Sequence, residues 1–254
     1  MKKNKMMRLA SAMMVMTLMT TSVISGTFAK YTTTASGTDA ARVAKWGVEI
    51  SGIADTLFAT TYAKDSETDI ANTVSATEKV VAPGTKNNTG VTFSLTGTPE
   101  VAVNIDIAVT GSTTDNITDV VLPAANGTYK DWTKAPYDTT FNLTSEYHPV
   151  EFTLKDGSTE LKKGTLAEIE TFLESKKGDY PAGTTLETIL GGTTGTYTLT
   201  WEWVFEHGST TEEKAMYDAA DTLLGNLAAG NQAAITGAST SIDFKIAITA
   251  TQID

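Results

Sequence analysis

The residues that could carry acid–base or metal chemistry begin with two histidines, His148 in SEYHPVE and His207 in VFEHGS. A zinc peptidase helix would carry His-Glu-x-x-His, because one helical turn then brings both imidazoles onto one metal. That motif is absent, since 59 residues separate the pair. The two could still meet in space with Glu146, Glu151 or Glu206, but we favour ordinary surface histidines at strand ends.

An acidic stretch, KDSETD, places Asp65, Glu67 and Asp69 at alternate positions, as calcium-binding loops often do. An EF-hand loop would next require Gly and, at its twelfth position, Glu. Ile70 and Ala76 stand at those positions instead. A solvated acidic loop is therefore favoured over a specific cation site.

Further catalytic patterns are absent or ambiguous. The sequence contains neither Gly-x-Ser-x-Gly nor a phosphate-binding Gly-Lys-Ser/Thr loop. Asp218 and Asp221 could pair their carboxylates on one helix face, although a polar face or a capping role is the favoured interpretation. Trp201 and Trp203 share one face of a strand and could bind a sugar, but so apolar a pattern favours the core. The sequence thus predicts no enzyme, no catalytic residue, no metal ligand and no cofactor.

The first 29 residues predict an export signal. They combine basic residues near the start with an uncharged run from Leu9 to Ala29 and small residues at its end. We expect cleavage after Ala29, so that residues 1–29 are a signal peptide. The alternative is an uncleaved anchor, because 21 uncharged residues could just span a bilayer.

The predicted mature chain is acidic and lacks cysteine. The signal holds four of the 19 basic residues and none of the 30 acidic ones, which leaves a net charge of −15. Such a charge disfavours nucleic acid, or an anionic membrane after cleavage, as a partner. Without cysteine the chain must rely on its core or on assembly, and thiol catalysis is excluded.

Most of the remaining chain alternates apolar and polar residues with period two, which predicts half-buried strands. Turn signals such as Pro83-Gly84 and Asp156-Gly157 separate these strands. Many strands with one apolar face require a second sheet to cover them, so we predict an all-β, antiparallel β-sandwich. The alternating segments lie at 46–50, 91–95, 101–109, 150–154, 197–205 and 242–248.

Two segments predict short helical insertions, near 165–177 and 210–224. Each begins with a capping box, Thr165 with Glu168 in the first and Thr210 with Glu213 in the second. Residues 46–254 contain no repeat or composition shift that would require a second domain. A single β-sandwich domain is therefore expected over 46–254.

Several phrases, in order along the chain, resemble the TasA/camelysin family of secreted bacterial proteins. They are SGTFAKY, WGVEISG, VVAPGTKNNTGVTFSLTGTPEVAVNIDIAV, YTLTWEWVFE and DTLLGN. The resemblance implies a jelly-roll β-sandwich, release by a dedicated signal peptidase, and a fibre subunit of the biofilm matrix or cell surface. It implies the chain itself as partner, with an accessory matrix or anchoring protein as a further candidate. The stretch from Thr110 to Ser145 has no counterpart in it.

Residues 30–45 form a polar segment that we expect to be flexible in the free subunit. In fibre-forming members of the family, the mature N-terminal segment inserts as a strand into the next subunit. The segment here is rich in Thr and free of Pro, and ten residues would span about 33 Å as a strand. The predicted donor strand comprises Lys30, Tyr31, Thr32, Thr33, Thr34, Ala35, Ser36, Gly37, Thr38, Asp39 and Ala40.

Three alternatives remain open at this point. Residues 30–45 could be a disordered leader, as exposed N-termini often are. The protein could be a surface adhesin that presents Trp201 or Trp203 to a glycan or a partner protein. A camelysin-like metallopeptidase is the third, and it would require bound zinc.

Overall fold

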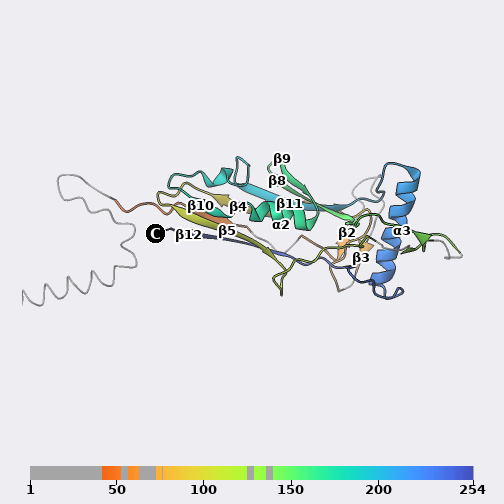
Figure 1. Ribbon diagram of the computed structural model, residues 1–254. Helices are drawn as coiled ribbons and strands as arrows, with labels where there is room; N and C mark the ends of the chain where they lie inside the picture. Colours follow the sequence, from red (N-terminus) through yellow and green to blue (C-terminus); the bar gives the residue numbers. More distant parts are fainter. Residues whose placement is uncertain are drawn as a thin grey trace, which may run out of the picture.

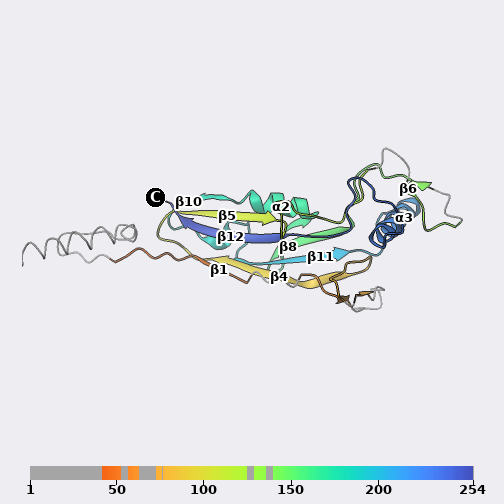
Figure 2. The same ribbon diagram turned by 90° about the horizontal axis from the view of Figure 1, so that it is seen from below.

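The computed structural model describes residues 42–52, 57–62, 73–75, 77–124, 129–135 and 140–253. The predicted signal peptide, the predicted donor strand and the acidic stretch at 65–69 lie outside this part of the chain. The described residues are mostly antiparallel β-sheet with two α-helices, in the two-layered arrangement of a sandwich (Figures 1 and 2). The predicted all-β class is therefore confirmed.

The larger sheet has five strands in the order β1-β4-β11-β8-β9. Alternate side chains of its strands point into the core, where Phe93, Phe152 and Trp201 are almost fully buried. The predicted alternations at 91–95, 150–154 and 197–205 fall in this sheet. Its strands are β1 (Glu49–Ser51), β4 (Lys86–Thr96), β8 (Val150–Asp156), β9 (Thr159–Gly164) and β11 (Thr196–Trp203).

A β-bulge interrupts the pairing of β4 with β11, where the register shifts between Leu199 and Trp201. Gly90 lies opposite this irregularity with a φ of +66°. A Cβ atom at Gly90 would lie 2.3 Å from the carbonyl oxygen of Leu199. Glycine is thus required there by both its positive φ and the close approach of the neighbouring strand.

The smaller sheet has three strands in the order β10-β5-β12: β10 (Gly178–Tyr180), β5 (Val103–Thr110) and β12 (Lys245–Gln252). The strand predicted at 242–248 therefore begins three residues later and extends to Gln252. The predicted start lies too early because Ile242 and Phe244 also pack against the core, although they precede the residues that pair with β5. Burial, rather than strand pairing, sets the apolar pattern at those two residues.

Helix α2 (Leu166–Glu174) covers one long side of the sandwich. It contacts β8 and β9 of the larger sheet and β5 of the smaller one. Its apolar stripe, Leu166, Ile169 and Leu173, is buried, and the predicted capping box at its start is present. Figure 2 shows the helix beside β5 and β8. Helix α2 thus closes one of the two seams at which the sheets meet.

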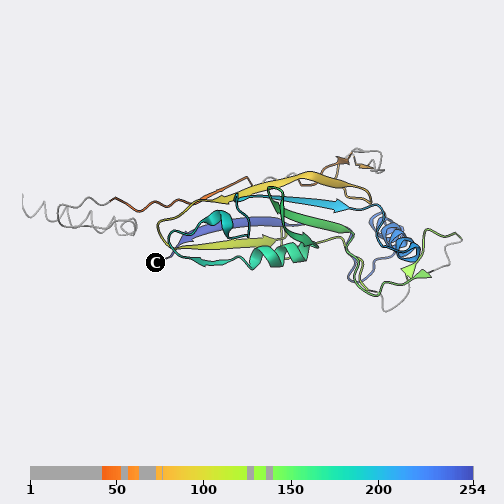
Figure 3. The same cartoon turned by 90° about the horizontal axis from the view of Figure 1, so that it is seen from above.

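Helix α3 (Thr211–Ala228) lies across one end of the sandwich (Figure 3). Its predicted capping box is present, and the helix continues four residues beyond the predicted end at 224. The described chain begins at the opposite end, where the C-terminus also lies (Figure 1). Short elements complete the fold: β2 (Thr61–Tyr62), β3 (Thr73–Val74), β6 (Tyr129–Lys130), β7 (Thr140–Phe141) and the 3₁₀ helix Leu186–Thr188.

Candidate functional site

No helix or strand of the described residues closes the second seam of the sandwich, and β12 forms one edge of that seam. β12 is the end strand of the smaller sheet and pairs with β5 on one edge only. No strand within the described ranges pairs with its other edge. An unpaired edge presents backbone N–H and C=O groups that another extended chain can bind.

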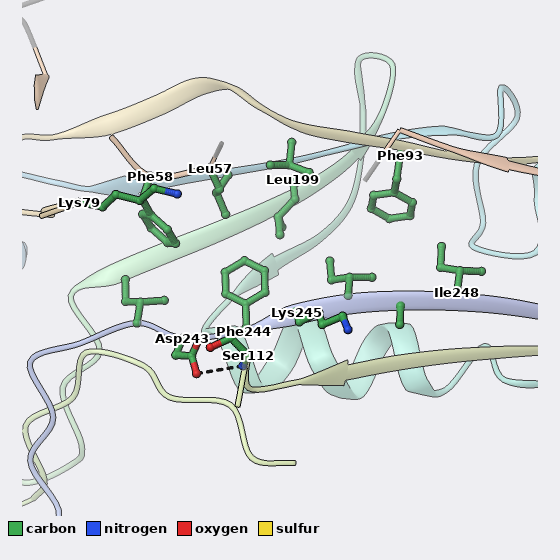
Figure 4. Close-up of a pocket in the computed structure, with 14 residues that line it drawn as sticks. Leu57, Phe58, Lys79, Phe93, Ser112, Leu199, Asp243, Phe244, Lys245 and Ile248 are labelled. Atoms are coloured by element: carbon green, nitrogen blue, oxygen red, sulfur yellow. Dashed lines mark hydrogen bonds between the residues drawn. The ribbon is translucent and has the colours of Figure 1, made fainter. Parts of the chain in front are cut away.

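A groove of about 720 Å³ runs along this edge, between β12 and the inner face of the larger sheet. Phe93 and Leu199 line it from the larger sheet, and Ile246 and Ile248 line it from β12. In Figure 4, Phe93 and Leu199 point down into the space that Phe244 and Ile248 face from below. The groove therefore lies directly against the apolar core: Phe93 and Leu199 are buried in its wall, whereas Phe244 and Ile248 are only partly buried.

Phe58 closes one end of the groove. Its ring contacts Phe244 edge-on, with centroids 6.3 Å apart, and lies 5.5 Å from the ring of Trp201. The indole Nε1 of Trp201 donates a hydrogen bond of 2.9 Å to the carbonyl oxygen of Leu57. These contacts fix Leu57 and Phe58 over the sheet, so that the open part of the groove lies along β12.

The alternation of β12 decides which of its side chains face the groove. Ile246 is buried, and Ile248 lies half-buried in the groove wall. Lys245, Thr249 and Thr251 are exposed on the other face. A strand added beside β12 would therefore bury every second side chain and leave the others in water.

The remaining predicted site residues lie elsewhere. The groove could not be predicted from the sequence, because an unpaired edge follows from the order of strands in the sheet and not from the alternation of apolar and polar residues.

Lys30 to Ala40 lie outside the described residues, as does the acidic loop at 65–69. Trp201 and Trp203 are buried, at 1% and 5% exposure, as the core interpretation predicts. They offer no aromatic platform for a glycan on this surface.

The two histidines are closer than the sequence indicated. Both are half-buried and line a second surface pocket, together with Glu146 and Glu213. His148 Nδ1 lies 3.3 Å from Asp119, and this hydrogen bond raises the pKa of His148. Burial lowers the pKa of His207. The described residues nevertheless contain no group of three or more His, Asp or Glu side chains placed to hold a metal ion.

Asp221 is a half-buried carboxyl whose contact the polar-face interpretation did not predict. It accepts a hydrogen bond of 2.8 Å from the Tyr147 hydroxyl, which attaches α3 to the chain just before β8. Burial, together with the nearby charge of Asp218, raises the pKa of Asp221 to about 7, although the hydrogen bond from Tyr147 lowers it. The tyrosine and the carboxylate lie 74 residues apart, so sequence spacing could not indicate their contact.

Comparison of the chain with protein-family models, with curated proteins and with solved structures found no match. The class that the fold defines is thus an antiparallel β-sandwich with an open, apolar seam. Among the described helices, none is long and apolar enough to cross a membrane.

Proposed function

We propose that this chain is a secreted structural protein, a subunit of extracellular fibres in a biofilm matrix or at the cell surface. After cleavage behind Ala29 by a dedicated signal peptidase, residues 30–40 of one copy would occupy the groove beside β12 of the next. The unpaired edge of β12 next to an apolar groove is the observation that carries this proposal. It assigns the chain a role in assembly rather than catalysis.

Residues 30–40 suit the groove beside β12 in length and composition. Residues 30–40 contain no Pro, and their Thr residues favour an extended conformation. Eleven residues span about 36 Å as a strand, which exceeds the roughly 26 Å of the eight-residue β12. An added strand would complete backbone hydrogen bonds along β12 and cover apolar side chains that now face solvent.

A strand beside β12 would give the smaller sheet a fourth member, in keeping with the proposed jelly-roll topology and the resemblance to the TasA/camelysin family. An accessory matrix or anchoring protein is a further proposed partner, since the same edge could accept its strand at the end of a fibre.

Electron microscopy of two purified forms tests the proposal. One form begins at Lys30 and the other at Ala41, and near-ultraviolet circular dichroism serves as the control that both sandwiches are folded. We expect filaments from the longer form only, because only that form carries the donor strand. Identical filaments from both forms would overturn the proposal.

A further inference from the structure

The direction of the two chain segments involved limits how one subunit can join the next. β12 runs from the α3 end of the sandwich toward the end at which the described chain begins (Figures 1 and 2). The chain from Arg42 into β1 runs the opposite way, toward α3. Two backbone hydrogen bonds tie the first described residues and the end of β12 to the same loop before β5. The Glu100 amide donates to the Lys45 carbonyl oxygen, and the Ile253 amide donates to the Ala102 carbonyl oxygen.

An added strand that runs antiparallel to β12 points in the same direction as β1. The donor's chain would then continue without reversal from the groove into its own sandwich, beyond the α3 end of the acceptor. A parallel strand would require the chain to turn back before β1. All strand pairs within the described residues are antiparallel as well.

The alternation of β12 further restricts the register. Directly opposed residues of an antiparallel pair lie on the same face of the sheet. The donor carries one acid, Asp39, which would be costly to bury without a partner in an apolar groove. Asp39 must therefore lie opposite an outward-facing residue of β12, and every second register is excluded.

Charge distinguishes among the registers that remain. With Asp39 opposite Lys245, the donor's acid meets the only charged residue of β12. Lys30 then falls opposite Asp254, because each pair is nine positions apart along its own strand. A shift of two residues in one direction would place Asp39 opposite Asp243, and a shift in the other would place it opposite Ala247. One register thus pairs opposite charges at both ends.

We propose that residues 30–40 of one subunit add antiparallel to β12 of the next, with Asp39 opposite Lys245, to form a polar head-to-tail filament. This inference rests on the proposed function and adds the direction and the register of the inserted strand. In this register, Ser36 and Thr38 cover the groove opposite Ile248 and Ile246. Thr32 and Thr34 continue the added strand beyond the groove, opposite Gln252 and Ala250. Each subunit's α3 end faces the N-terminal end of its neighbour.

Disulfide trapping tests the register, because the chain contains no cysteine of its own. In the form that begins at Lys30, Ala35→Cys combined with Thr249→Cys would place two outward Cβ atoms about 5 Å apart, near bonding distance. The matched controls combine Ala35→Cys with Thr251→Cys or with Ala247→Cys, two positions away and thus about 7 Å further along the strand. We expect a ladder of cross-linked oligomers from the first pair only.

Each outcome separates the register from the proposed function. A ladder from a control pair, with filaments present, would overturn the register and retain the strand-addition mechanism. A cross-linked monomer would show that the segment fills its own groove, and would overturn the head-to-tail arrangement. The absence of both filaments and ladders from every variant would overturn the proposed function itself.

Charge reversal offers a second test of the same pair. Lys245→Glu should raise the protein concentration needed for assembly by about twofold to fivefold, as expected for an exposed ion pair replaced by a repulsive one. Adding Asp39→Lys to that variant should restore assembly. Failure of the double variant to recover, with both sandwiches folded, would overturn the contact between residues 39 and 245.

Discussion

Arg42 is joined to Glu100 by two hydrogen bonds, from Nη1 to Oε2 at 2.6 Å and from Nη2 to Oε1 at 2.5 Å. The Lys45 amide donates a third bond to the same carboxylate at 2.9 Å. The hydrogen bond from Arg42 is the main reason that the pKa of Glu100 falls to about 2. This cluster fixes the point at which the proposed donor segment leaves the sandwich.

Replacing Glu100 by Ala should therefore loosen that point and leave the core unchanged. We expect the Lys45 amide to exchange its hydrogen faster in the variant, because its acceptor is gone. Exchange of the amides in β11 should not change. Hydrogen–deuterium exchange checks both, and unchanged exchange at Lys45 would show that the bond to Glu100 does not hold this segment.

A charge within the groove should block assembly but not folding. Ile248→Arg would place a cation where the donor strand must pack, whereas the free subunit can still direct that side chain toward solvent through the open seam. We expect no filaments from this variant by electron microscopy. Thr249→Arg, on the outward face of the same strand, is the matched control and should assemble normally.

The stability of the α3 end should depend on pH through Asp221. Its pKa of about 7 lies above the ordinary value of 3.8, so the folded protein retains a proton that the unfolded chain has lost. Stability should therefore fall as pH rises from about 4 to about 7, by on the order of 3 kcal/mol, and then level off.

Asp221→Asn should remove most of this dependence, since the amide cannot ionise. Thermal melting at pH 5 and pH 8 measures the effect, with Glu212→Gln in the exposed first turn of α3 as control. If Asp221→Asn retained the full slope between these pH values, the burial of the carboxyl would not be its cause.

Trp201 should hold Leu57 and Phe58 at the end of the groove. Trp201→Phe keeps a ring in the core but removes the hydrogen bond to Leu57 and part of the contact with Phe58. We expect a loss of about 1–3 kcal/mol in the free energy of unfolding. Urea denaturation measures the change, and a loss below about 0.5 kcal/mol would contradict a structural role for this bond.

The sequence predicted what local chemistry determines. Period-two alternation located the strands of the larger sheet, and the two capping boxes located the starts of α2 and α3, because both signals depend on neighbouring residues. What it could not predict depends on contacts between distant residues. The order of the strands leaves β12 at an edge, the fold brings His148 and His207 to one pocket, and α3 places Asp221 against Tyr147.

The difference between the two seams affects how long a fibre of these subunits would persist. Helix α2 completes the core on one side within the subunit, whereas the other side leaves groove residues such as Phe244 and Ile248 only partly covered. Under the proposed function, a neighbour would supply the last portion of each subunit's folding energy. Dissociation would then resemble partial unfolding, so a fibre built this way would outlast the dilution that disperses assemblies held by surface contacts alone.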